Sequence, residues 1–469
     1  MKHMRQWLMD VSLIDGWLPV TVFVIAVASA VALLIGAIGG GRNGQGKQDG
    51  HVRLIVLPLV VAAISGAAGY TLTWLLSDVF VVFGVGLGPR VMAWVAVGFA
   101  AVGYAVAHIA LRNGMMRAIA ALLVVSAILA TAIGIDQSYG EYATIGSLFG
   151  DDSYSQANLT GLVKRKDLIS VSQWRGQVAD GTIRNIPSNG TVSKIDIPAT
   201  ESHFKARKAL VYLPPAALAE GKRKPALPVI LMMSGQPGSP GRAFQAGGIQ
   251  TMMDGYAKSH DGLAPIVIAA DQLGDDSHNT LCVDSKVYGN AFTYLTRDVI
   301  DWAKNNLPAA QDAKDWAIAG FSQGATCSLQ IGVNHPELFG TMIPTDSEIG
   351  PTNGTRQEMI DRFFDGDVEA YESQVPINAI RNRAPTHQTL IMGAGEEDAA
   401  SARNIRTIAP VAVKAGMHVT AVESIGNAHD WHAVQDVLRY GLAVFGYDTG
   451  LSDVRPNLSD YPNLKRVAV

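Results

Sequence analysis

The residues WAIAGFSQGA, at Trp316–Ala325, are the most informative segment of this sequence. A short apolar run leads into Gly-x-Ser-x-Gly, and a helical pattern follows at once. This order is typical of a nucleophile elbow, a sharp strand-to-helix turn that exposes a serine hydroxyl. Glycines are needed at both flanks because side chains there would collide with neighbouring backbone. We therefore predict that Ser322 is a nucleophile.

The pattern around this motif alternates short apolar or β-branched runs with helical segments from Thr191 onward. Such alternation predicts a largely parallel sheet covered by helices on both faces. The expected strands are Val192–Ile197, Lys208–Leu213, Pro228–Met233, Pro265–Ala270, Trp316–Ala319, Met342–Pro344, Thr389–Met392 and Val419–Glu423. The expected helices are Phe292–Asn306, Gln323–His335, Ala400–Ala415 and His432–Phe445.

A serine hydroxyl is a weak nucleophile at neutral pH, so a general base must take its proton. In this arrangement the base follows the last strand. His429 lies in the sequence GNAHDW, directly after the expected strand Val419–Glu423. We predict His429 as the base and interpret His432 as structural or as a pocket wall.

The third catalytic group should be a carboxylate that orients the imidazole. Three acids, Glu396, Glu397 and Asp398, follow the expected strand Thr389–Met392. Asp398 is the preferred acid, as the last of a Gly-x-x-Asp turn, and Glu397 is the alternative. Either residue would also suit the N-terminus of the following helix, as a solvated charge.

The oxyanion formed during attack needs two N–H donors. One expected donor is the backbone of Gln323, at the start of a helix. The other is expected in the loop after Pro228–Met233, where Gln236 is preferred because Pro237 has no N–H.

Further polar residues follow the expected strand Pro265–Ala270, at an edge where pocket residues gather in such sheets. They are Asp271, Asp275, Asp276 and His278. We predict substrate contacts at Asp271 and at Trp431, and we expect neither a metal nor a cofactor. The two cysteines, Cys282 and Cys327, rule out a sulfur-rich metal site. They would pair outside the cytoplasm or remain two buried thiols.

The first 136 residues contain four apolar segments, each close to the ~20 residues that cross a bilayer as a helix. The predicted spans are Trp17–Ile38, Leu54–Leu76, Val91–Leu111 and Ala118–Ile135. Cations gather in the loops after spans one and three, which are therefore predicted to be cytoplasmic. They are Arg42, Lys47, Arg53, Arg112 and Arg117. The part that follows, and the catalytic domain with it, would be extracytoplasmic.

These patterns predict three regions: a four-helix transmembrane region at 1–136, a linker and irregular segment at 137–190, and a catalytic domain at 191–469. Residues 137–469 hold 29 Lys and Arg against 36 Asp and Glu, a balance of 29 − 36 = −7. Nucleic-acid binding needs a concentrated basic face. We therefore expect no nucleic-acid partner.

The region Thr191–Tyr447 resembles the esterase family of α/β-hydrolases that includes antigen 85 mycolyltransferases, feruloyl esterases and S-formylglutathione hydrolases. The resemblance rests on SGQ at Ser234–Gln236, GFSQG at Gly320–Gly324 and GNAHDW at Gly426–Trp431. The four spans before this domain look like those of actinobacterial membrane-anchored esterases. The sequence departs from the mycolyltransferases at Ser234, where they carry an acid. The resemblance implies an α/β-hydrolase domain and acyl-ester chemistry at the cell envelope.

The leading hypothesis is therefore a membrane-anchored serine ester hydrolase that forms an acyl-enzyme on Ser322. Its expected partners are the membrane and an acyl ester, such as a lipid or envelope glycolipid. An acyltransferase that delivers the acyl group to a sugar or lipid hydroxyl would use the same triad. A different class of function is a membrane sensor or transporter with a non-catalytic hydrolase-like domain. His108 is the ionisable residue well within a predicted span, and a transporter would need such a residue inside the membrane.

Overall fold

The computed structural model describes residues 2–40, 52–82, 84–150, 154–163 and 165–469. The chain forms two compact units. One comprises Met1–Asp151 with Ala428–Asp430, and the other comprises Asp152–Asn427 with Trp431–Val469. Each unit has its own hydrophobic core.

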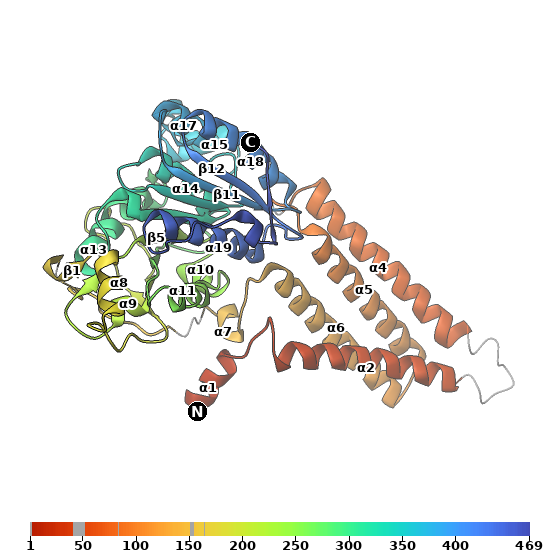
Figure 1. Ribbon diagram of the computed structural model, residues 1–469. Helices are drawn as coiled ribbons and strands as arrows, with labels where there is room; N and C mark the ends of the chain where they lie inside the picture. Colours follow the sequence, from red (N-terminus) through yellow and green to blue (C-terminus); the bar gives the residue numbers. More distant parts are fainter. Residues whose placement is uncertain (1, 41–51, 83, 151–153, 164) are drawn as a thin grey trace. The chain divides into compact units, whose positions relative to one another are not determined.

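The N-terminal unit is helical (Figure 1). Its helices are α1 (Lys2–Met9), α2 (Trp17–Gly40), α4 (Leu57–Trp74), α5 (Gly88–Leu111), α6 (Met115–Tyr139) and α7 (Ile145–Leu148), and π-helical turns at Val52–Val56 and Leu75–Val79 extend α4. Four stretches are long and apolar enough to cross a membrane: Trp17–Gly39, Arg53–Val79, Gly88–Leu111 and Met115–Tyr139. The four predicted spans are thus confirmed as helices. Arg42 and Lys47, which the predicted orientation uses, lie outside the described residues.

Small residues bring these helices close together. A Cβ placed on Gly69 would lie 2.7 Å from the Phe99 ring, and one on Gly66 would lie 3.1 Å from the Ala100 side chain. Such close approach is how helices associate where lipid removes the hydrophobic driving force. His108 is fully buried in this bundle, with its ring 4.6 Å from that of Tyr104.

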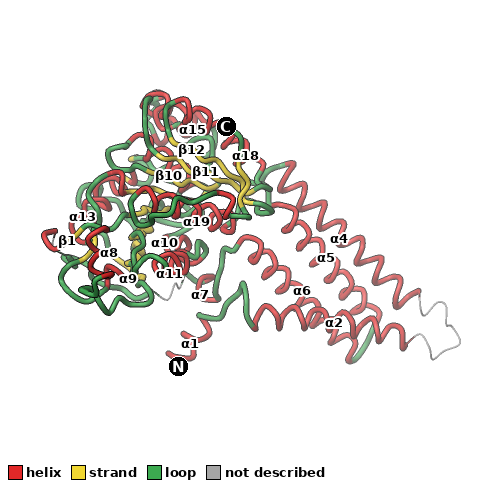
Figure 2. Tube along the Cα trace, in the orientation of Figure 1, coloured by secondary structure: helices red, strands yellow, loops and turns green. Residues whose placement is uncertain are grey.

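The second unit is built on a central sheet, whose strands are yellow in Figure 2. The sheet has nine strands in the order β13-β12-β11-β10-β9-β5-β6-β3-β2. The strands are β2 (Thr191–Ile195), β3 (Ala209–Leu213), β5 (Val229–Met233), β6 (Ile266–Ala269), β9 (Trp316–Phe321), β10 (Thr341–Thr345), β11 (Thr389–Gly395), β12 (His418–Ser424) and β13 (Leu464–Arg466). The six neighbouring strands β6, β5, β9, β10, β11 and β12 pair in parallel. The strands β2, β3 and β13 pair antiparallel to their neighbours. All eight predicted strands are present. The edge strand β13 was missed because its three residues, LKR, carry no apolar alternation.

Helices cover both faces of this sheet, as predicted. Alternate residues of one strand point to opposite faces. The helices of this unit are α8 (Val171–Ala179), α9 (Pro215–Leu218), α10 (Pro240–Gln245), α11 (Ile249–Lys258), α12 (Ala291–Thr293), α13 (Val299–Asn306), α14 (Gln323–Asn334), α15 (Arg356–Phe363), α16 (Val368–Gln374), α17 (Pro376–Arg383), α18 (Ala399–Lys414) and α19 (Trp431–Asp448). In β5, Leu231 belongs to a core with α13, α14, α17 and α18, whereas Ile230 belongs to a core with α10, α11 and α19.

The predicted helices differ from these in detail. The segment Phe292–Asn306 is divided into α12, a π-helical turn at Tyr294–Asp298, and α13. Four helices before β6, α8 to α11, were not predicted. Three more, α15 to α17, fill the connection between β10 and β11 and were not predicted either. The start of α15 carries a capping box, in which Thr355 and Glu358 each bond the other's backbone N–H. That signal was readable in the sequence.

Candidate active site

The turn after β9 holds Ser322 in an unusual backbone conformation. Its φ of 55° and ψ of −117° are strained for any residue with a side chain. The Ser322 N–H donates to the Thr345 carbonyl of the neighbouring strand at 3.0 Å. Helix α14 begins at the next residue. The predicted strand, turn and helix of a nucleophile elbow are therefore all present.

The flanking glycines show why the motif has this composition. A Cβ on Gly320 would overlap the backbone of Gly324. A Cβ on Gly324 would overlap the carbonyl of Ser234, in the loop after β5. The turn can close only if both positions lack a side chain.

The loop after β5 lies directly beside the elbow because β5 pairs with β9. A Cβ placed on Gly235 would lie 3.4 Å from the Cβ of Ser322. Gln236, the predicted second donor, is the next residue and is half-buried. The two predicted sources of N–H donors, Gln236 and Gln323, thus follow adjacent strands at the same edge of the sheet.

His429 lies in the loop between β12 and α19. This loop is tied to the one after β11, because Glu396 N donates to Ser424 O and Glu397 N donates to Asn427 O, both at 2.8 Å. These bonds bring together the two loops in which the base and the acid were predicted.

Two aspartates share the surroundings of His429. One ligand-type atom each from Asp346, Asp398 and His429 all lie within 4.8 Å of one another. Both aspartates are buried, and His429 is half-buried. The preferred acid, Asp398, is in this group, whereas the alternative, Glu397, is not.

Each aspartate is held by backbone donors. One oxygen of Asp398 accepts from Ala400 N and Ser401 N at 3.1 Å, which caps α18. One oxygen of Asp346 accepts from Gly395 N at 2.8 Å. Asp346 was not among the residues predicted from sequence. The available signal was an acid directly after the expected strand Met342–Pro344, at the edge where functional residues gather.

The donor set of this group, two carboxylates and one imidazole, would also suit a divalent cation. The same set fits an imidazole oriented by a carboxylate. The position of the group in the fold favours an oriented imidazole over a metal site. The loops after β10, β11 and β12 follow the elbow strand β9, and the chain order nucleophile, acid, base is the one that serine hydrolases of this fold use.

Asp271, a predicted substrate contact, is fully buried. Its carboxylate accepts three bonds from Arg207, through backbone N at 2.6 Å, Nε at 3.0 Å and Nη2 at 2.7 Å. Burial opposes the charge on this guanidinium, but hydrogen bonds and charges of Asp271 and Asp276 raise the pKa of Arg207 overall. These contacts favour a structural role for Asp271, and its contact with substrate stays a prediction.

Other predicted residues also have structural contacts. Trp431, the second predicted substrate contact, is 2% exposed, and its ring lies 4.9 Å from that of Phe321 beneath the elbow. His278 stacks on Tyr288 with a ring separation of 4.2 Å. Asp275 bonds the backbone and hydroxyl of Ser277.

Cys282 and Cys327 form a disulfide with a Cα–Cα distance of 5.7 Å. It joins the segment after β6 to helix α14. Of the two alternatives for the cysteines, the structure therefore has the pair.

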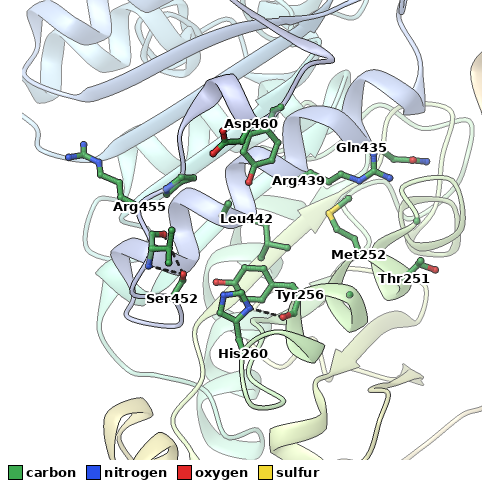
Figure 3. Close-up of a pocket in the computed structure, with 16 residues that line it drawn as sticks. Thr251, Met252, Tyr256, His260, Gln435, Arg439, Leu442, Ser452, Arg455 and Asp460 are labelled. Atoms are coloured by element: carbon green, nitrogen blue, oxygen red, sulfur yellow. Dashed lines mark hydrogen bonds between the residues drawn. The ribbon is translucent and has the colours of Figure 1, made fainter.

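A groove of about 750 Å³ lies elsewhere on the second unit, between α11, α19 and the segment 452–461 (Figure 3). Tyr256 and His260 stack at 4.0 Å on one side, and Arg439 and Gln435 lie on another. None of the predicted catalytic residues lines this groove. It is therefore distinct from the elbow.

Comparison with known proteins gives matches of two kinds. The profile of the Putative esterase family matches residues 201–435. An uncharacterized protein of Corynebacterium glutamicum is 32% identical over 332 residues, which are 68% of this chain and 74% of that protein.

Solved structures with similar chains share little sequence. S-formylglutathione hydrolase from Agrobacterium tumefaciens is 15% identical, with a TM-score of 0.46 over 57% of this chain and 98% of that one. MPT51 of Mycobacterium tuberculosis is 15% identical, with a TM-score of 0.40 over 55% and 98%. The ferulic acid esterase of Anaeromyces mucronatus is 17% identical, with a TM-score of 0.44 over 57% and 94%.

Proposed function

Because the chain belongs to this esterase family, we propose that it is a serine-dependent carboxylic ester hydrolase whose nucleophile is Ser322. His429 is the general base. Asp398 orients the imidazole, and Asp346 is a second carboxylate beside it. The backbone N–H groups of Gln323 and Gln236 form the oxyanion hole.

The observation that carries this proposal is the conformation of Ser322. A non-glycine residue at φ 55° and ψ −117°, placed between a buried strand and a helix, costs about 1–3 kcal/mol, and such strained residues cluster at active sites. Gly235, from the adjacent oxyanion loop, lies beside it. The N-terminus of α14 adds a favourable field for negative charge at the same point.

The reaction would proceed through an acyl-enzyme. Ser322 Oγ attacks the ester carbonyl carbon while His429 takes the hydroxyl proton. The tetrahedral oxyanion accepts bonds from the two N–H donors, each worth roughly 10²–10³ in rate. The C–O bond then breaks, and His429 returns the proton to the departing alcohol. In the second half, water attacks the acyl carbonyl carbon and His429 takes its proton. The bond from the acyl carbon to Ser322 Oγ then breaks, His429 returns the proton to Ser322, and the carboxylic acid leaves.

The second half of the reaction distinguishes an ester hydrolase from an acyltransferase. If a sugar or lipid hydroxyl replaces water, the same residues carry out acyl transfer. A membrane anchor favours a lipid or envelope ester as the acyl donor, because tethering concentrates the enzyme at that surface. Incubation of the acyl-enzyme with candidate alcohols, followed by product analysis, distinguishes the two.

We also propose that the catalytic domain is extracytoplasmic. The disulfide between Cys282 and Cys327 supports this side, since disulfides persist in oxidising compartments. Arg112 and Arg117, at the ends of α5 and α6, support a cytoplasmic location for the connection between these helices.

The test is labelling of the full-length, detergent-solubilised protein with a fluorophosphonate probe, together with hydrolysis of p-nitrophenyl acetate. Wild type should label and turn over, whereas Ser322→Ala and His429→Ala should do neither at a measurable rate. Ser373→Ala, on helix α16, is the matched control and should behave as wild type. Wild-type protein that folds but neither labels nor hydrolyses would overturn the proposal and favour a binding domain.

A further inference from the structure

One buried amide joins the two loops that would form the oxyanion hole. Gln272 follows β6 and is 1% exposed. Its Nε2 donates to the Ser234 carbonyl at 2.7 Å and to Gln323 Oε1 at 3.0 Å. Strands β6, β5 and β9 are consecutive in the sheet. The Gln272 side chain therefore extends from the end of β6, past the loop that follows β5, to the elbow that follows β9.

The direction of these bonds is fixed by backbone groups. Asn279 Nδ2 donates to the Thr352 carbonyl at 2.9 Å, and Asn279 Oδ1 accepts from Leu281 N at 3.1 Å. Gln323 Nε2 donates to the same Oδ1 at 3.4 Å. Since an amide has one donor end and one acceptor end, Gln323 Oε1 must accept, and Gln272 must donate to it. Both amide hydrogens of Gln272 are thus used.

Gln272 is itself held in place. Its backbone carbonyl accepts from Thr280 Oγ1 at 2.7 Å. The preceding residue, Asp271, is fixed by Arg207 and accepts backbone bonds from Leu273 and Gly274. Because these bonds hold the backbone of Gln272, its side-chain amide can hold Ser234 and Gln323 at a defined distance from each other.

Resting on the proposed function, we propose that Gln272 is a positioning residue that sets the distance between the two oxyanion donors. Ser234 lies two residues before Gln236, and Gln323 carries the other donor on its own backbone. Both N–H groups must lie about 2.7–3.1 Å from a single developing oxyanion. A shift of the loop relative to the elbow would break a buried hydrogen bond of Gln272, so the amide resists that shift.

A second buried glutamine provides a matched control. Gln388 is 6% exposed, and its Nε2 donates to the carbonyls of Gly332 and Phe339, both at 2.7 Å. It makes the same kind of bridge, but near the C-terminal end of α14, whereas the elbow lies at the N-terminal end of that helix. Loss of its amide should affect stability and leave the oxyanion donors in place.

The experiment compares Gln272→Met with Gln388→Met in the full-length, detergent-solubilised enzyme. Methionine keeps the side-chain length and removes the amide. We expect both variants to lower the thermal midpoint. Only Gln272→Met should lower kcat for p-nitrophenyl acetate, by about 10²-fold, the effect of misplacing one oxyanion donor. Its KM should stay within about threefold, because the donors act mainly on the transition state.

Gln323→Met breaks the same bond from the other side and keeps the backbone donor. It should lower kcat similarly, and the double variant Gln272→Met/Gln323→Met should be no worse than the poorer single variant. If Gln272→Met does not fold, the kcat of Gln323→Met alone tests the inference. A kcat for Gln272→Met, or in that case for Gln323→Met, equal to that of Gln388→Met overturns the inference. Failure of the proposed function looks different, since wild type would then neither turn over nor label.

Discussion

One carboxylate oxygen of Asp346 and one of Asp398 lie within 4.8 Å of each other and of a ring nitrogen of His429. The two residues follow different strands, β10 and β11, and are separated by three helices in the sequence. Two carboxylates beside one imidazole give the proposed base two possible orienting partners.

This arrangement predicts partial redundancy. Removing the single acid of such a triad costs about 10⁴ in kcat. We expect Asp398→Asn to lower kcat by only about 10²-fold and Asp346→Asn/Asp398→Asn by about 10⁴-fold. Asparagine still accepts a bond at the start of α18, so the fold should persist.

Ester hydrolysis by the purified variants measures this effect. Glu397→Gln is the control, because Glu397 lies outside the group, and it should stay within about threefold of wild type. If Asp398→Asn alone is as inactive as the double variant, Asp346 does not substitute for it.

The elbow should not tolerate a side chain at Gly324. A Cβ there would overlap the Ser234 carbonyl, and overpacking of this kind costs about 3 kcal/mol. Gly324→Ala should therefore lower the thermal midpoint strongly. Beyond its chain neighbours and the backbone of α11 itself, Gly255 has no atom within 4 Å of its Cβ position. Gly255→Ala should stabilise by about 0.5–1 kcal/mol, and equal midpoints for the two variants would contradict the geometry.

The disulfide between Cys282 and Cys327 closes a sequence separation of 45 residues. Loss of such a crosslink typically costs about 2–4 kcal/mol. Reductant should lower the thermal midpoint of wild type and leave that of Cys282→Ser/Cys327→Ser unchanged. Two free thiols found by alkylation and mass spectrometry in protein isolated without reductant would refute the pairing in the cell.

Reporter fusions test the proposed side of the membrane. Alkaline phosphatase, which needs an oxidising compartment, should be active when fused after Val469 and inactive when inserted after Asn113, between α5 and α6. A green fluorescent protein should give the opposite pattern at both positions. The reverse result would place the catalytic domain in the cytoplasm.

The contacts of Asp271 predict stability rather than recognition. Arg207→Met leaves a fully buried carboxylate without its cation and should cost about 3–5 kcal/mol. We expect a large loss in thermal midpoint and a KM within about threefold of wild type. A rise in KM of tenfold or more with little change in midpoint would instead support the predicted substrate contact.

Most of the fold could be predicted from local sequence pattern. The eight principal strands and the four apolar helices were predictable because burial on a sheet or in lipid imposes a period or a length that can be read directly. The three helices α15 to α17 were harder, since they are short and their apolar faces are narrow. The edge strand β13 depends on pairing with β12, and its own residues do not signal it.

The proposed catalytic residues divide in the same way. Ser322, His429 and the region of Asp398 could be named as candidates from local pattern, because a strained turn requires glycines and because strand order limits where a base and an acid can lie. The three-dimensional fold was needed to show that Asp346 lies with Asp398, that Glu397 does not, and that Gln272 bridges the loop after β5 to the elbow. These relationships arise where the ends of several parallel strands meet at one edge of the sheet. Residues far apart in the chain become neighbours there, and no local pattern records which side chains will touch.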